Sequence, residues 1–115
     1  MEQKTYFLDI DGCIFKHHDN FLNGIHTVEP LEGVQEKLLE WHCQGDKIIL
    51  TTGRPGTTRK FLENHLFLNG IIYDQLIMDC GPGVRILIND IDPKNPDIIK
   101  AKAINITRNL GIGKI

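Results

Sequence analysis

The sequence predicts an α/β fold in which a Rossmann-like parallel sheet forms the middle of three layers, with helices on both faces. Short apolar segments alternate along the chain with segments of helical periodicity, an order that favours parallel strands joined by helices. One apolar segment, 48–50, shows no alternation, as expected for a central strand covered on both sides. The 115 residues fit one domain, 1–115, and leave no room for a second.

The first strand is predicted over 5–9, where a short apolar run ends in Asp9 and is soon followed by Gly12. Residues 13–30 show no helical period and end at Pro30. We therefore interpret them as a loop or small hairpin that lies as a flap over the end of this strand.

The first helix is predicted over 31–43, because apolar residues recur there at spacings of four and three. The residues that set this period are Val34, Leu38 and Trp41. Gly45 can end the helix in a left-handed conformation, and the second strand follows over 47–52.

The second half of the chain repeats this order. Thr57 or Thr58 can cap the next helix, which ends before Gly70. A forced turn, Gly81-Pro82-Gly83, lies between two further apolar runs. Strands are predicted over 71–78 and 85–89, with 103–106 as a candidate for a short fifth strand.

Acidic and hydroxyl side chains follow the predicted strands at their carboxyl ends, where open α/β sheets bind ligands. Asp9 and Asp11 follow the first strand, Thr52 ends the second, and Asp90 follows the run 85–89. Aspartates also form turns after strands, so each residue alone is a weak signal. Because three carboxylates at one edge repel each other, we expect them to recruit a hard cation, and magnesium suits a site that also binds phosphate.

Three segments resemble motifs of the haloacid dehalogenase superfamily. Residues 7–12, FLDIDG, are similar to its first motif, 48–55, IILTTGRP, to its second, and 86–90, ILIND, to its fourth. Together they extend over roughly residues 5–92. The resemblance implies a magnesium-dependent phosphomonoester hydrolase that acts on a small phosphorylated substrate.

The resemblance also implies a role for each matching residue. Asp9 would be the nucleophile that forms an aspartyl-phosphate, and Asp11 the general acid and base. Thr52 would hydrogen-bond a phosphoryl oxygen, with Thr51 as the alternative if the strand is shifted by one residue. Gly12 and Gly53 would let the backbone approach the substrate. Arg54 would contact the substrate or cap the next helix, and Mg²⁺ would be bound by Asp9, Asp90 and the backbone carbonyl of Asp11.

The sequence departs from the family pattern at two positions. Cys13 replaces the usual threonine after the first motif, and no lysine precedes Asp90 to balance the charge of the site. Lys94 is the favoured substitute because it follows the predicted fourth strand, whereas Arg85 would lie at the opposite end of that strand. The intervals after Gly12 and Arg54 are too short for a cap domain. We therefore expect an open cleft, closed by the 13–30 loop or by a neighbouring subunit of a homo-oligomer.

The composition excludes several classes of partner. A net charge of −2 provides no broad basic surface for nucleic acid, and no apolar segment approaches the roughly 20 residues that span a membrane. Three widely spaced cysteines, Cys13, Cys43 and Cys80, suit free thiols in a reducing cytosol, so a cytoplasmic location is expected.

Two other classes of function remain open at the level of the sequence. A receiver domain has a similar length and an acidic magnesium site, and Asp79 would be its phosphorylated residue. However, Gly12 and the segment 52–54 do not suit a receiver. The missing lysine also leaves open a binding module that kept the fold and lost turnover. The stretch 87–93, followed by 103–105, looks similar to small phosphatase-like proteins found with surface-polysaccharide genes, and a sugar phosphate is the substrate that this resemblance implies.

Overall fold

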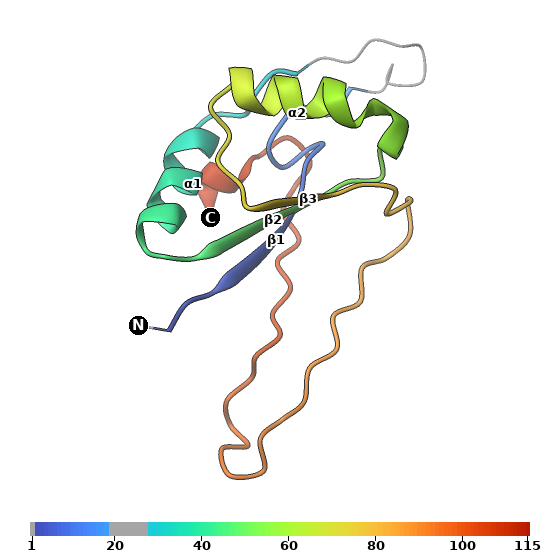
Figure 1. The fold of residues 1–115 in the computed structure, drawn as a ribbon. Coiled ribbons are helices and arrows are strands. Elements are labelled where there is room, and N and C mark those ends of the chain that lie inside the picture. Colours follow the sequence, from blue (N-terminus) through green and yellow to red (C-terminus); the bar gives the residue numbers. More distant parts are fainter. Residues whose placement is uncertain (1, 19–27) are drawn as a thin grey trace.

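The computed structural model describes residues 2–18 and 28–115, which form three parallel strands and two α-helices (Figure 1). In chain order the elements are β1 (Thr5–Asp9), α1 (Val34–Cys43), β2 (Lys47–Thr51), the 3₁₀ helix η2 (Gly56–Thr58), α2 (Arg59–Leu68), β3 (Gln75–Ile77) and the 3₁₀ helix η3 (Ile112–Lys114). The strand order is β1-β2-β3, and both pairs are parallel. The prediction of an α/β fold with a parallel sheet is therefore confirmed.

The two helices begin and end where local backbone chemistry directs them. Gly33 adopts a φ of 78°, so α1 begins at Val34, three residues later than predicted. Gly45 and Gly70 have φ values of 84° and 67°, and each lies just beyond the end of a helix, as a left-handed C-terminal residue does. The pattern of the sequence thus placed both helices correctly to within a few residues.

The predicted third layer is not formed by the described residues. Figure 1 shows α1 and α2 on the same face of the sheet. Both crossovers lead in one direction across the sheet, and crossovers of one hand then place both helices on one face. On the other face the side chains of Phe7 and Ile77 are 53% and 44% exposed. Within the described residues no α-helix follows β3, and the 3₁₀ helix η3 packs into the same core, so the prediction of helices on both faces is not confirmed.

The core lies between the sheet and the two helices. Leu8, Ile48 and Leu50 project from the strands, and Leu38 and Leu62 project from the helices against them. Ile112 of η3 is 1% exposed and joins the same cluster, so the C-terminal segment closes the core. Tyr6 stacks on the single tryptophan, Trp41, with ring centroids 3.8 Å apart.

Residues 84–105, which we call the arm, leave the body of the molecule and return to it (orange in Figure 1). The strands predicted over 85–89 and 103–106 are wrong, because the arm has no strand in the structure. The radius of gyration is 15.3 Å, against about 13 Å for a compact domain of this length. The molecule measures 52 × 30 × 25 Å, and the arm accounts for its elongated outline.

The length of the preceding link explains why no fourth strand joins the sheet. To form a parallel strand beside β1, the chain leaving β3 would have to cross three strand spacings and return to the amino end of the sheet. Such crossovers need a dozen or more residues, whereas only residues 78–84 separate β3 from the predicted strand. The apolar pattern of 85–89 indicated a strand without indicating a partner.

The ends of the predicted 13–30 loop form part of a small hairpin. Phe15 is fully buried and makes isolated bridges with Asp11 and with Pro30. The Lys16 N–H donates to the Glu29 carbonyl over 2.8 Å. Residues 19–27, which would form the flap itself, lie outside the described part of the chain.

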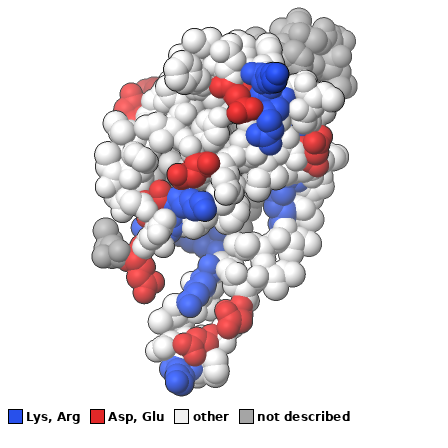
Figure 2. Space-filling view, viewed as in Figure 1, with Lys and Arg blue, Asp and Glu red and all other residues white. Residues whose placement is uncertain are grey.

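Charges of both signs are interspersed on the face of the molecule shown in Figure 2, and neither sign dominates it. Within residues 2–18 and 28–115, none of the helices has the length and apolar character needed to cross a membrane.

Candidate active site

The carboxyl ends of the strands bring together the residues of the first two motifs. Asp9, the last residue of β1, is in register with Thr51, the last residue of β2. The Thr52 N–H donates to the carbonyl of Ile77 over 3.0 Å, so the pairing with β3 continues one residue beyond the strand. Parallel pairing therefore places Asp9 and the Thr51-Thr52 segment at one edge, as the sequence predicted.

A tight loop holds Asp11 next to this edge. The carbonyl of the fully buried Ile10 accepts backbone hydrogen bonds from Cys13, Ile14 and Phe15, at 3.2, 2.8 and 3.1 Å. Gly12 has a φ of 90°, which few side chains tolerate, and its N–H donates back to the Phe15 carbonyl over 2.7 Å. The loop is thus fixed by its own backbone.

Arg54 forms a bidentate ion pair with Asp11. Its Nε donates to Oδ2 over 3.0 Å and its Nη2 to Oδ1 over 2.6 Å. The Arg54 side chain is 4% exposed and that of Asp11 is 19% exposed, so water screens this pair weakly. Arg54 was predicted to contact substrate or cap a helix. In the structure it joins the loops that follow β1 and β2.

The segment 52–54 is clamped to the chain that follows β3. Thr52 is 1% exposed, and its hydroxyl oxygen accepts the Arg54 N–H over 3.1 Å. The Asp79 and Cys80 N–H groups donate to the carbonyls of Arg54 and Thr52, at 2.9 and 3.0 Å. A Cβ on Gly53 would lie 3.1 Å from the Gly81 carbonyl oxygen, so the two backbones are close there. This packing holds the Thr52 region rigid next to Asp9.

The pKa of Asp9 is raised above its usual range, mainly because the protein on one side of the carboxyl group removes water from it. A backbone hydrogen bond from Ile10 opposes this effect, the negative charge of Asp11 adds to it, and Arg85 and His17 lower the pKa again. Asp9 is nevertheless an exposed residue, so its carboxylate is accessible from solvent. An accessible, partly desolvated carboxylate is a suitable nucleophile.

Cys13 cannot compete with Asp9 as a nucleophile near neutral pH. Burial raises the pKa of its thiol to about 11, and the negative charges of Asp9 and Asp11 add to the effect. The side chain packs against the core behind the loop.

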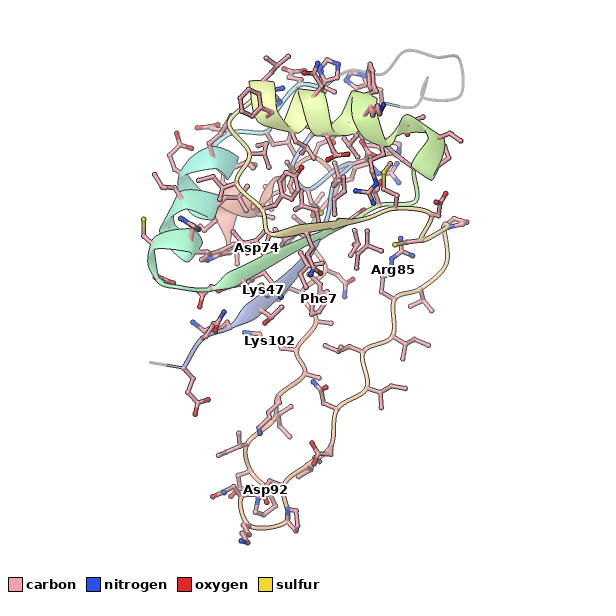
Figure 3. All side chains as sticks on the ribbon, viewed as in Figure 1. Phe7, Lys47, Asp74, Arg85, Asp92 and Lys102 are labelled. Carbon is pink, nitrogen blue, oxygen red and sulfur yellow. The ribbon has the colours of Figure 1, made fainter. Side chains whose placement is uncertain are left out.

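The described structure does not bring Asp90 and Lys94 to this edge. Both belong to the exposed arm, and Figure 3 shows Asp92, which lies between them, at the far end of the arm. The Lys94 N–H donates to Asp92 Oδ1 over 2.9 Å, as part of the turn at the tip. Lys94 was preferred over Arg85 on the assumption of a fourth strand, and that strand is not formed.

Arg85 instead lies at the start of the arm, close enough to Asp9 for its charge to lower the Asp9 pKa. Its guanidinium donates to the carbonyls of Gly81 and Gly83, at 3.0 and 2.5 Å, and so fixes the turn before the arm.

A magnesium site is not complete within the described part of one chain. No group of three or more His, Cys, Asp or Glu residues there lies close enough to hold a metal ion. Of the predicted ligand residues, Asp9 and Asp11 belong to this edge, whereas Asp90 belongs to the exposed arm; the Asp11 carboxylate, which was not the predicted ligand atom, is engaged by Arg54. The predicted set of Asp9, Asp11 and Asp90 therefore does not fit Mg²⁺ in the single chain.

His17 and Asn109 lie close together near this edge, and the sequence did not predict this contact. The charge of His17 acts on Asp9, and the His17 N–H donates to Asn109 Oδ1 over 2.7 Å. Asn109 has a φ of 67°, and its own N–H donates to the Gly12 carbonyl over 2.8 Å. The C-terminal turn thus supports the loop that follows Asp9. No local pattern in the sequence links residues this far apart.

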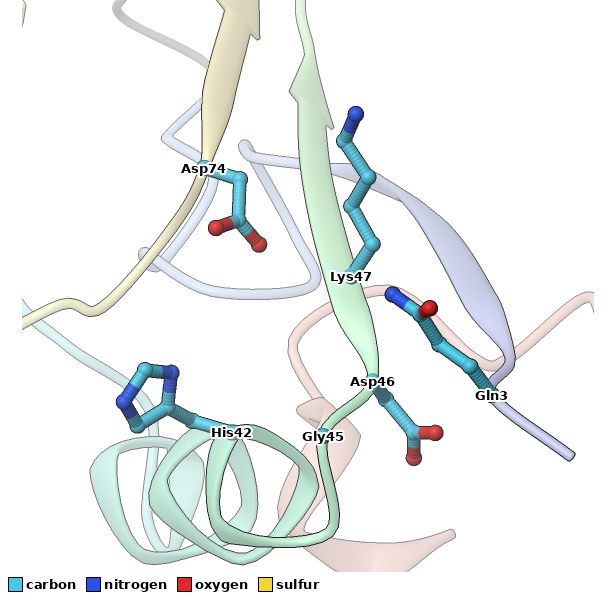
Figure 4. A pocket seen from close by; sticks show the side chains of 6 residues that line it. All are labelled: Gln3, His42, Gly45, Asp46, Lys47 and Asp74. Atoms are coloured by element: carbon cyan, nitrogen blue, oxygen red, sulfur yellow. The ribbon is translucent and has the colours of Figure 1, made fainter. Parts of the chain in front are cut away.

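A shallow pocket lies at the opposite, amino-terminal end of the sheet (Figure 4). It is lined by Gln3, His42, Gly45, Asp46, Lys47 and Asp74. Asp46 Oδ1 accepts the Lys4 N–H over 2.9 Å, and Asp74 Oδ2 accepts the Ile48 N–H over 2.8 Å. These carboxylates anchor the starts of strands, so the chemistry of the molecule is better sought at the carboxyl edge.

Comparison of the chain with protein-family models, with curated proteins and with solved structures finds no match in any of the three.

Proposed function

We propose that the chain is a capless phosphomonoester hydrolase of the haloacid dehalogenase type, acting on a small phosphorylated metabolite such as a sugar phosphate. One observation carries the proposal: the accessible Asp9 carboxylate shares a sheet edge with Asp11 and with the clamped Thr52 segment. A nucleophile, a proton carrier and hydrogen-bond donors for phosphate are the groups that a covalent phosphatase needs.

In the first step a carboxylate oxygen of Asp9 attacks phosphorus, and the bond from phosphorus to the alcohol oxygen breaks. Asp11 donates a proton to that leaving oxygen. In the second step Asp11 removes a proton from water as the water attacks the aspartyl-phosphate, which releases inorganic phosphate and restores Asp9. The Thr52 hydroxyl and the Gly53 N–H would stabilise the phosphoryl oxygens, since the N–H groups of Thr52 and Arg54 already donate to the Ile77 carbonyl and to the Thr52 hydroxyl oxygen.

The bidentate ion pair places a condition on this mechanism. Both oxygens of Asp11 are engaged by Arg54, so Asp11 can carry a proton to the leaving group only after the guanidinium moves. A phosphate dianion is a strong bidentate partner for arginine. We therefore expect phosphate binding to draw Arg54 from Asp11, which couples the arrival of substrate to release of the general acid.

Magnesium dependence belongs to the proposal as well, although the described residues of one chain do not complete the ligand set. No step above depends on the ion. The same incompleteness favours one alternative, a binding module that retains the fold and has lost turnover.

Hydrolysis of p-nitrophenyl phosphate, with and without added Mg²⁺, tests the proposal directly. Asp9→Asn should abolish turnover and leave the far-ultraviolet circular dichroism unchanged. Asp79→Asn is the matched control, because Asp79 Oδ1 accepts the Gly56 N–H and has no part in the mechanism. Loss of turnover in Asp79→Asn with activity retained in Asp9→Asn would favour the receiver reading. No turnover with any phosphorylated metabolite would favour the binding module.

A further inference from the structure

The arm exposes a series of large apolar side chains that a soluble monomer would be expected to cover. On its outgoing limb Val84, Ile86, Leu87 and Ile88 are 84%, 77%, 53% and 86% exposed. On the tip and the return limb the exposed residues are Ile91, Ile98, Ile99 and Ile104. A run that is apolar on both sides suits a strand inside a sheet and not a solvated loop.

The outgoing and return limbs of the arm do not pair their backbones with each other in the described structure. Within the described residues no strand pairing joins them, and one side-chain hydrogen bond, from Asn89 Nδ2 to the Lys100 carbonyl over 3.2 Å, bridges them. The backbone of the outgoing limb is therefore available to pair with another strand.

The accessible surface area of the chain also indicates that surface is left uncovered in the monomer. The accessible surface is 8117 Å², whereas a compact monomer of 13.1 kDa exposes about 6,400 Å². The excess is on the order of 1,700 Å², about twice the 800 Å² that each partner buries in a standard interface. The excess is therefore large enough to supply the area of a stable dimer.

The sheet offers a place for this strand at its open edge. In the described structure the strand partner of β1 is β2, and the opposite edge of β1 has no strand beside it. Phe7 on β1 is 53% exposed beside that edge (Figure 3). The seven-residue link 78–84 is too short for the arm of the same chain to reach this position as a parallel strand. The arm of a second copy is not bound by this restriction.

We propose that two copies of the chain exchange arms, so that residues 85–89 of one copy pair in parallel with β1 of the other and deliver Asp90 to the edge that carries Asp9. With residue 89 beside Asp9, Asp90 lies beside Ile10, one residue beyond the end of the added strand, at the edge that carries Asp9. The exchange covers the apolar arm and supplies the third carboxylate that the single chain lacks. Its meaning for catalysis rests on the proposed function, but the exchange itself does not.

Oligomeric state and cross-linking test the exchange without reference to metal or activity. We expect sedimentation velocity to give twice the mass of 13.1 kDa, and Ile88→Asp to give the monomer. Phe67→Asp, an equally exposed apolar position on α2, should remain dimeric. In a Cys43→Ser background, mixed Phe7→Cys and Leu87→Cys chains should form a covalent heterodimer under oxidation, because the proposed register places these residues side by side. A monomeric wild type would overturn the exchange. So would an intramolecular disulfide in a chain that carries both Phe7→Cys and Leu87→Cys.

Complementation tests the delivery of Asp90. Asp9→Asn and Asp90→Asn chains are refolded together, and bound Mn²⁺ is counted by electron paramagnetic resonance. Half of the dimers are mixed and each contains one intact site, so about one quarter of the wild-type sites should return. Binding no higher than the average of the separate variants, together with cross-linking, would refute the role of Asp90.

Phosphatase assays on the same samples separate this inference from the proposed function. If mixing restores Mn²⁺ sites but the wild type shows no turnover, the phosphatase proposal would be refuted and the arm exchange would be supported. If the wild type hydrolyses phosphate esters but mixing Asp9→Asn with Asp90→Asn chains does not change the turnover, the phosphatase would stand and the delivery of Asp90 by the partner would be refuted.

Discussion

The ion pair between Arg54 and Asp11 should be among the strongest single electrostatic contributions to the stability of the fold. Its two hydrogen bonds measure 2.6 and 3.0 Å, and the side chains are 4% and 19% exposed. The perturbation is a double-mutant cycle with Arg54→Met, Asp11→Asn and the combined variant. The surface pair Lys37–Glu40, at 3.1 Å with side chains 21% and 51% exposed, provides a matched control cycle.

The expected magnitude follows from the geometry. Unit charges about 4 Å apart attract by about 4 kcal/mol at an effective dielectric constant of about 20. Removing one partner of a buried pair costs about 3–5 kcal/mol, because the other charge stays buried without compensation. Here Arg54→Met also leaves Asp11 and Asp9 to repel each other. The combined variant removes both charges, so it should cost much less than the sum, with a coupling energy of about 1–3 kcal/mol. The surface pair should show about 0.5 kcal/mol or less.

Urea unfolding followed by the fluorescence of the single tryptophan, Trp41, measures these differences, since that side chain is 6% exposed in the core. A loss of 3–5 kcal/mol would lower the melting temperature by about 12–20 °C for a chain of this length. Protein concentration must be held constant, because association would stabilise the fold by mass action. A coupling energy no larger than that of Lys37–Glu40 would refute the view that burial strengthens the pair.

Three further outcomes follow from the geometry. With a thiol pKa of about 11, Cys13 should react with iodoacetamide at pH 8 about 100-fold more slowly than the exposed Cys43, as peptide mapping can measure; equal rates would contradict its burial. Because folding raises the Asp9 pKa, the native state binds the proton more tightly, so stability is lost as pH rises from the ordinary carboxyl value of 3.8 through the folded pKa. Asp9→Asn should therefore raise the unfolding midpoint at pH 7 and lose this advantage at the acid end; a lower midpoint at pH 7 would contradict it. Gly113→Ala should cost about 1–3 kcal/mol, because its Cβ would lie 2.6 Å from the Glu32 carbonyl oxygen, whereas Gly83→Ala, with nothing within 4 Å, should be neutral; equal effects would contradict the packing of η3.

The part of the site that depends on local pattern and parallel pairing was predictable from the sequence. An apolar run ending in acid predicted β1, and a run apolar on both sides predicted β2. Two neighbouring parallel strands place their carboxyl ends at one edge, so Asp9 and Thr52 come together without further information. The bidentate contact of Arg54 with Asp11 was not predictable, because it depends on how two loops from different strands approach each other.

The fourth strand failed for a different reason. Residues 85–89 have the composition and periodicity of a central strand, and these properties indicate what a segment can become but not which strand it pairs with. The length of the link 78–84 did contain the missing information, because it is shorter than a parallel crossover requires. Attention to that link would have argued against a fourth strand in the same chain, and against the choice of Lys94.

The two defects of the single chain have one structural cause. Because no α-helix follows β3 in the described structure, the second face of the sheet lacks its layer, and Phe7 and Ile77 stay exposed. For the same reason the chain has no crossover that could return 85–89 to β1, and Asp90 stays away from Asp9. A partner that only covered apolar surface would leave the carboxylate set incomplete, and a metal ion alone would leave the arm exposed. An exchanged arm would cover its own apolar side chains and deliver Asp90 with the same residues, so we expect both the cross-linking and the Mn²⁺ complementation to succeed.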